Sequence, residues 1–164
     1  MALDYNKTLN LPKTDFPMRA GLPNREPGFL KQWEDDKVFE ELLKKNKGKP
    51  KYVLHDGPPF SNGNIHMGTA LNKVLKDFIN RYKAMCGYYT PYKPGWDNHG
   101  MPIESAIIKK SKLDRKKMTI PEFRNKCREF AESFVDIQRE QFIRLGVMGD
   151  WENPYLTMDP KFEE

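Results

Sequence analysis

The stretch from residue 51 to residue 97 restricts the fold of this chain more than any other part of the sequence. It begins with Lys51–His55, a short run of β-forming residues, which leads into a Gly57-Pro58-Pro59 loop that lasts until about Ile65. After a helical pattern, the aromatic, proline-punctuated Tyr88–Asp97 predicts a second strand with irregular ends. Two strands joined through one helix favour a parallel pair with a right-handed crossover. We therefore expect an α/β fold that contains the building block of a Rossmann-like parallel sheet.

Helical patterns surround this predicted sheet. The helix between the strands runs from about Met67 to Cys86, and Gly87 is well placed to end it. Roughly helical apolar spacing also predicts helices over residues 29–43 and 103–112. A Thr119-Ile120-Pro121-Glu122 capping box starts a long helix that ends near Gly146. The apolar residues on one face of the 67–86 helix are Leu71, Val74, Leu75, Phe78, Tyr82 and Met85, and those on the expected core face of the long helix are Phe123, Cys127, Phe130, Phe134 and Ile137.

The chain is expected to form an N-terminal region over residues 1–50 and a sheet-containing region over residues 51–164. Its 164 residues can bury one ordinary core but not two. Prolines at positions 12, 17, 23 and 27 interrupt the first 28 residues, which predicts an extended strap before the first helix. The tail after Met148 contains loop signals and one expected short strand.

Composition limits the cellular setting and the class of partner. No apolar run approaches the ~20 residues of a membrane span, and the first residues do not resemble a signal peptide, so we expect a cytoplasmic, soluble protein with no membrane partner. Cys86 and Cys127 stand far apart, which predicts reduced core thiols and no cysteine metal site. The net charge of +5 permits a nucleotide or RNA partner without choosing between them. The basic runs at residues 44–51 and 109–117 are typical of solvated helix ends.

All three histidines, His55, His66 and His99, lie between residues 55 and 100, and six of the eleven glycines lie there too. The predicted loop and helix start lie at the carboxyl end of a parallel strand, where free N–H groups and the helix dipole favour phosphate. Gly63 and Gly68 allow a ligand close to the backbone. His66 and Thr69, three residues apart, project to the same side. An anion site is therefore expected here.

The loop contains neither GxxxxGK[ST] nor GxGxxG, the two common phosphate motifs. Instead, the run GPPFSNGNIHMGTALNK, followed by PGWDNHGMPIE, resembles the first signature region of class I aminoacyl-tRNA synthetases, and among them the isoleucine enzymes. Similarity to this family extends from about Tyr5 to Tyr155 and includes the run LPKTDFPMR at residues 11–19. The resemblance covers nearly the whole chain and implies that residues 51–164 are the first half of a catalytic domain.

The resemblance implies a role for each matching residue. His66, the first histidine of the signature, helps bind ATP and stabilise charge on its phosphates, with Thr69 as the other catalytic position. Asp97 of the GWD run binds the α-ammonium of isoleucine. The substrate carboxylate itself attacks the α-phosphate, so the protein positions groups and neutralises charge. The implied ATP-binding residues are Pro59, Asn62, Gly63, His66, Gly68 and Thr69, and the implied amino-acid-binding residues are Gly57, Pro58 and Asp97.

The implied partners are isoleucine, ATP and tRNA(Ile), bound by a complete enzyme that is monomeric. Magnesium accompanies ATP and is held by phosphate oxygens and water, with no metal site in the protein. The family signature ordinarily ends in a second histidine, whereas this chain has Thr69, which predicts slower catalysis. The KMSKS half, the editing insertion and the anticodon-binding helices have no match here, so we expect an N-terminal part that is inactive alone.

Alternative interpretations exist for the chain and for single residues. If the chain is a degenerate short paralogue, it would bind ATP or an adenylate without turnover. If it is an RNA-binding module, it would bind RNA through its basic runs. His66 could be a helix-start residue bonded only to backbone, and Asp97 could cap a turn. His55 could contact the site or be structural, and His99 could orient Asp97.

Overall fold

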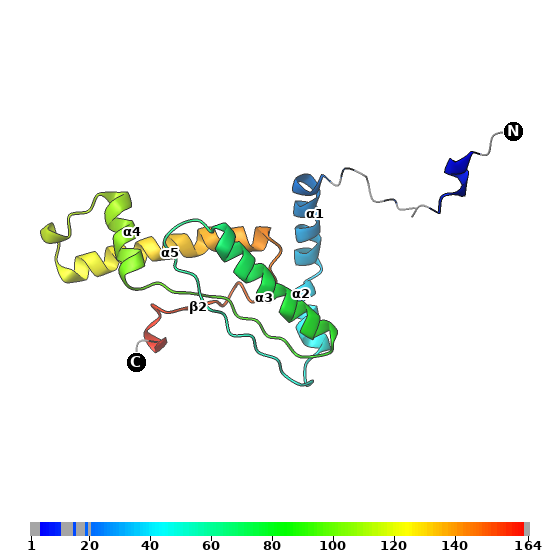
Figure 1. The fold of residues 1–164 in the computed structure, drawn as a ribbon. Coiled ribbons are helices and arrows are strands. Elements are labelled where there is room, and N and C mark those ends of the chain that lie inside the picture. Colours follow the sequence, from blue (N-terminus) through cyan, green and yellow to red (C-terminus); the bar gives the residue numbers. More distant parts are fainter. Residues whose placement is uncertain (1–3, 11–14, 16–18, 20, 163–164) are drawn as a thin grey trace.

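The computed structural model describes residues 4–10, 15, 19 and 21–162 and shows helices arranged around a narrow parallel sheet (Figure 1). Strand β1 (Gly95–Trp96) pairs in parallel with β2 (Tyr155–Leu156), with Gly95 opposite Tyr155. The segment 51–60 runs parallel to 89–97 and is joined to it by bridges at its two ends. Three extended segments thus lie in parallel, in the order 51–60, 89–97 and 155–156. The expected partial Rossmann-like sheet is confirmed.

Lys51–His55 does not form the continuous strand that its sequence predicts. Only its first residue is bridged, Lys51 to Tyr89, and the next bridge joins Phe60 to Asp97. Tyr52 N donates to the Tyr89 carbonyl at 2.9 Å, and Asp97 N donates to the Pro59 carbonyl at 2.9 Å. Between these points, the prolines at positions 58, 59, 91 and 94 carry no N–H and cannot extend the ladder.

The N-terminal prediction is wrong in two respects. Pro12 and Pro17 lie outside the described residues, but Pro23 and Pro27 lie inside helix α1 (Leu22–Asp35) rather than in an extended strap. Pro23 occupies the first turn, where the missing N–H has no partner to lose. The single helix predicted over 29–43 is divided, because Lys37 has a φ of +50° and separates α1 from α2 (Val38–Lys45).

The other predicted helices are present. Helix α3 (Met67–Met85) is followed by Gly87 at a φ of +87°, and α4 (Met101–Ser111) matches the helix expected over 103–112. Both hydrogen bonds of the Thr119–Glu122 capping box are formed at the start of α5 (Ile120–Arg144). Short 3₁₀ turns complete the described chain, namely η1 (Tyr5–Thr8), η2 (Arg115–Lys117) and η3 (Pro160–Phe162).

The buried face of α5 differs from the predicted stripe. Ile137 is exposed, whereas Cys127, Phe130 and Phe134 are only half-buried. The fully buried residues of this helix are Phe123, Ala131, Val135, Gln138 and Phe142. Their intervals of eight, four, three and four residues average about 3.8 residues per turn, whereas the predicted stripe advances by about 3.5, so the two share only Phe123.

The core lies between β1 and α5. Trp96, Val135 and Phe142 form its buried cluster, and Trp151 stacks on Phe142 with ring centroids 6.0 Å apart. Trp96 has no exposed surface. The prediction of a core thiol at Cys86 is wrong, because that residue is exposed. Cys127 is half-buried. No helix within the described ranges is long and apolar enough to cross a membrane.

Helix α3 turns its apolar stripe to solvent and its polar side to the body of the protein. Leu71, Leu75, Phe78 and Tyr82 are among its exposed residues. The buried residues of this helix are Lys73, Asp77, Asn80 and Ala84. Asp77 is satisfied there, since its carboxylate accepts from Arg81 Nε at 2.6 Å and from Met148 N at 2.9 Å.

Candidate functional site

The loop that contains the predicted site residues is fastened to two helices. Gln138 and Gln141 of α5 hold it from one side, and Gln141 Oε1 accepts from Ile65 N at 2.9 Å. Lys110 of α4 donates to the Asn62 carbonyl at 3.1 Å, and the Asn62 side chain donates to the Pro102 carbonyl at 3.4 Å. The predicted loop therefore has a defined conformation, set by residues far along the chain.

His66 caps the N-terminus of α3. Its Nδ1 accepts from Thr69 N at 3.2 Å, which is the backbone bond of a helix-start residue. A neutral imidazole that accepts at Nδ1 carries its proton on Nε2, so the exposed ring still presents one N–H donor. Gly68 makes room for this ring, because a Cβ there would lie 3.0 Å from His66 Cε1.

Asp97 lies beside the loop because its segment is bridged to it. Ser61 N donates to the Asp97 carbonyl at 3.2 Å, which complements the bond from Asp97 N to Pro59. Among the described residues, the half-buried carboxylate accepts from His99 N and from Thr157 Oγ1, both at 3.4 Å. Turn capping is thus formed with long contacts, and His99 reaches Asp97 through its backbone and through Thr157 Oγ1, 3.2 Å from its Nδ1.

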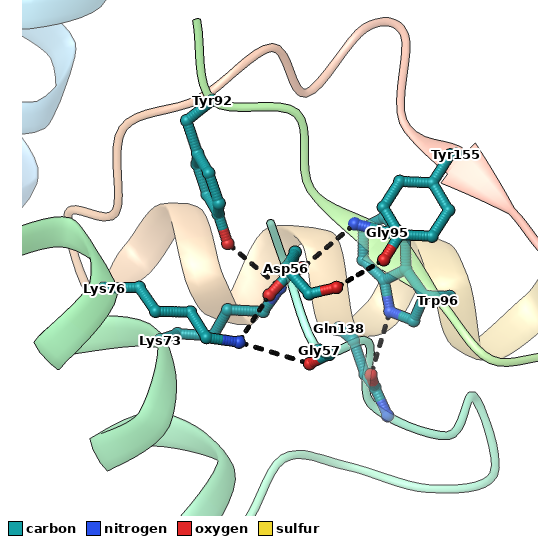
Figure 2. Close-up of polar contacts among 9 residues, drawn as sticks. All are labelled: Asp56, Gly57, Lys73, Lys76, Tyr92, Gly95, Trp96, Gln138 and Tyr155. Atoms are coloured by element: carbon teal, nitrogen blue, oxygen red, sulfur yellow. Dashed lines mark hydrogen bonds and ion pairs between the residues drawn. The ribbon is translucent and has the colours of Figure 1, made fainter. Parts of the chain in front are cut away.

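Sequence reasoning missed a buried charge network at the base of the loop (Figure 2). Asp56, immediately before Gly57, is 0% exposed and forms an ion pair with Lys73 of α3, which is 1% exposed. Its carboxylate also accepts from Lys76 Nζ at 2.8 Å and from Gly95 N at 3.1 Å. One carboxylate therefore joins the loop, α3 and β1. The available signal was a pair of lysines on the side of α3 opposite its apolar stripe.

The electrostatics of this network keep Asp56 ionised. Burial opposes ionisation, but the charge of Lys73 and hydrogen bonds from Lys73 and Lys76 outweigh it and hold the pKa of Asp56 below the usual value of an aspartate. Burial, with the nearby charges of Asp56 and Asp97, raises the pKa of Tyr155 to about 12. Tyr155 therefore stays protonated and donates to the Asp56 carbonyl at 2.5 Å. His55 is exposed, and its ring stacks on that of Tyr155 at 6.0 Å.

The structure joins the loop to Asp97 through the Phe60–Asp97 bridge, and the two described hollows lie elsewhere. One pocket, of about 350 Å³, lies between α4 and α5 beyond Asn98, and another, of about 1000 Å³, lies between α1, α2 and the end of α5. Neither is lined by His66, Gly68 or Asp97. Within the described part of the chain, no three His, Cys, Asp or Glu residues are grouped to hold a metal ion.

The family model for "tRNA synthetases class I (I, L, M and V)" matches residues 28–164. The chain is 62% identical over 161 residues to the Isoleucine–tRNA ligase of Caldicellulosiruptor bescii and 58% identical to that of Staphylococcus epidermidis. These alignments cover 98% of this chain and 18% of each relative, so the chain spans less than a fifth of their length.

One solved structure supports the fold alone. It is described as the ternary complex of Agrobacterium radiobacter K84 agnB2 LeuRS-tRNA-LeuAMS, and it matches with a TM-score of 0.63 at 23% identity. The match covers 84% of this chain and 16% of that chain.

Proposed function

Because this chain belongs to the class I tRNA synthetases, we propose that it contributes the first half of the adenylate-forming site of an isoleucine–tRNA ligase. The complete enzyme would activate isoleucine with ATP to isoleucyl-adenylate and transfer the isoleucyl group to tRNA(Ile). The observation that carries the proposal is the Phe60–Asp97 bridge, which places a carboxylate beside a loop that runs directly into a helix N-terminus. The enzyme is proposed to act in the cytoplasm as a monomer, with residues 1–50 as a separate N-terminal region.

The proposed amino-acid subsite consists of Gly57, Pro58 and Asp97. The contacts that Asp97 makes at 3.4 Å are long for a charged acceptor, so its carboxylate retains capacity for a substrate ammonium. Gly57 and Pro58 lie on the other side of the bridge and contribute backbone and apolar contacts.

The proposed ATP subsite lies along the loop and the start of α3. Its residues are Pro59, Asn62, Gly63, His66, Gly68 and Thr69. The Nε2–H of His66 can donate to a phosphate oxygen while Nδ1 keeps its capping bond, so one ring can perform both tasks. Magnesium bound to the phosphates would be coordinated by phosphate oxygens and water. Removing His66 therefore tests structure and binding together unless the two tasks are separated.

Two substitutions separate them. Asparagine is a good N-cap, so His66→Asn keeps the cap and removes the phosphate donor, whereas His66→Ala removes both and costs about 1 kcal/mol of folding free energy. We expect His66→Asn to unfold at the same urea concentration as the unchanged chain. It should bind a non-hydrolysable isoleucyl-adenylate analogue roughly tenfold to a hundredfold more weakly in calorimetric titration. Equal affinity in His66→Asn would remove the proposed role, and no heat from the unchanged chain would contradict a formed site.

A degenerate, non-catalytic protein is the second candidate, and Thr69 favours it. A threonine supplies a hydroxyl but no positive charge where the family signature has a second histidine. In this alternative the adenylate analogue binds, but no isoleucine-dependent pyrophosphate exchange occurs. The assay requires a chimaera in which this chain replaces the matching segment of the C. bescii Isoleucine–tRNA ligase. Exchange by the chimaera supports the synthetase, and its absence despite analogue binding supports the degenerate form.

A further inference from the structure

Gln138 of α5 connects the two sides of the proposed site through one buried amide. The residue is 2% exposed. Its Nε2 donates to the carbonyls of Phe60 at 3.0 Å and Gly63 at 2.7 Å, and its Oε1 accepts from Trp96 Nε1 at 2.9 Å. Figure 2 shows the contact with Trp96, the residue before Asp97. Both amide donors and one acceptor position are therefore used on the loop and on β1.

These bonds fix the direction of two peptide planes. In a trans peptide, the C=O and the N–H of the next residue point in opposite directions. The Phe60 carbonyl faces Gln138, and the Ser61 N–H on the other side of that peptide donates to the Asp97 carbonyl at 3.2 Å. This peptide is thus held between α5 and the segment that carries Asp97, which fixes the spacing of the loop and Asp97.

The second peptide is fixed from one side only. Because the Gly63 carbonyl faces Gln138, the Asn64 N–H points away from it. Over the described ranges, no protein acceptor meets this N–H. Gln141, one turn further along α5, donates to Asn64 Oδ1 at 3.1 Å and bonds the next amide, Ile65 N. The backbone of the loop is therefore oriented, and the N–H of the exposed Asn64 is open to solvent and to a ligand.

We propose that Gln138 is a positioning residue of the adenylate-forming site, directing the Asn64 N–H toward the phosphate of the bound nucleotide and holding the loop at a fixed distance from Asp97. The inference rests on the proposed function for its ligand. Its structural part, the orientation of the loop by Gln138, can be measured without any ligand.

The test compares three variants of the full chain. Gln138→Met keeps a similar volume and removes all three hydrogen bonds. Gln138→Glu places a carboxyl against two carbonyls, where only its protonated form can donate, and then to one of them. Gln32→Met makes the same chemical change on an exposed position of α1 and is the matched control. Affinity for the isoleucyl-adenylate analogue is measured by calorimetry at pH 5.5 and pH 8, and exchange of the Ser61 amide is measured by NMR.

We expect Gln138→Met to bind the analogue about tenfold to a hundredfold more weakly at both pH values, while Gln32→Met binds as the unchanged chain does. Relative to the unchanged chain at the same pH, Gln138→Glu should lose less affinity at pH 5.5 than at pH 8, a rescue that loss of packing alone would not produce. The Ser61 amide should exchange at least about tenfold faster in Gln138→Met, with no matching change in α3.

The outcomes separate the two proposals. Ser61 exchange in Gln138→Met that equals exchange in Gln32→Met overturns the positioning role, whether or not a ligand binds. Faster Ser61 exchange with unchanged affinity also overturns it, because the orientation would then be irrelevant to binding. Failure of the unchanged chain to bind, together with faster Ser61 exchange in the variant, contradicts the proposed function and leaves the orientation of the loop by Gln138 standing.

Discussion

Replacing Lys73 by methionine removes the fully buried partner of Asp56 while retaining most of its volume. The carboxylate stays buried and keeps Lys76 Nζ at 2.8 Å and Gly95 N at 3.1 Å. It loses the cation that has no access to water. Lys76→Met is the matched control, because it is the same substitution three residues along α3. It removes the second lysine that pairs with Asp56, and the side chain of that lysine is 15% exposed.

The two variants should differ because their desolvation differs. Breaking a buried ion pair typically costs about 3–5 kcal/mol, since the remaining charge is left without compensation. The two donors that stay on Asp56 place Lys73→Met near the lower end, at about 3 kcal/mol. Lys76 regains part of its hydration whenever the pair opens, and Asp56 keeps Lys73, so Lys76→Met should cost about 1 kcal/mol.

Urea unfolding followed by tryptophan fluorescence measures both values, since Trp96 and Trp151 lie in the core. A loss of about 3 kcal/mol is a large part of the stability of a domain this size. The expected order is unchanged chain, then Lys76→Met, then Lys73→Met, with no change in the slope of the transition. Equal free energies of unfolding for the two variants would refute the reasoning, because burial would then not determine the strength of these contacts.

Three further predictions concern the same region. The depressed pKa of Asp56 means that its stabilising contribution is fully present above about pH 4 and is lost as the pH falls through the folded-state pKa. The urea midpoint should therefore fall as the pH is lowered from 5 to 2, and the fall should be smaller in Lys73→Met. Gly95→Ala should destabilise the chain by about 2–3 kcal/mol, since the new Cβ would overlap the ring of Tyr155. Gly28→Ala in α1 is the control, because its Cβ meets no atom and should stabilise the chain by about 0.5–1 kcal/mol. Equal urea midpoints for the two alanine variants would argue against the close approach of β1 and β2. Thr69→His in the chimaera should speed isoleucine-dependent pyrophosphate exchange roughly tenfold to a hundredfold, and exchange that is equal or slower would count against a charge contact at this position.

Local patterns predicted what short-range chemistry determines. The Thr119–Glu122 capping box and Gly87 at the end of α3 both depend on neighbours within a few residues, and both are formed. The apolar periodicity of residues 67–86 predicted the helix but could not tell which face is buried. The buried face carries Lys73, which pairs with Asp56, a residue that lies outside the helix.

The parts that were missed depend on contacts between distant segments. Gln138 bonds to carbonyls 75 and 78 residues earlier, and nothing in the local sequence of α5 distinguishes it from a solvated glutamine. The first strand failed as a continuous element because prolines in its neighbour, not in Lys51–His55 itself, remove the ladder donors. The loop residues of the site were found from their resemblance to a family, and their roles remain predictions.

The outward-facing stripe of α3 also affects how this chain behaves in concentrated solution. Nineteen helical residues extend for about 28 Å, and exposed side chains such as Met67, Leu75 and Met85 line that length. Contiguous apolar area of this kind attracts other apolar surfaces, and the attraction strengthens in sulfate or phosphate buffers. Osmotic and light-scattering measurements should therefore give net attraction between molecules, and low-salt, dilute conditions should suit spectroscopy on the isolated chain.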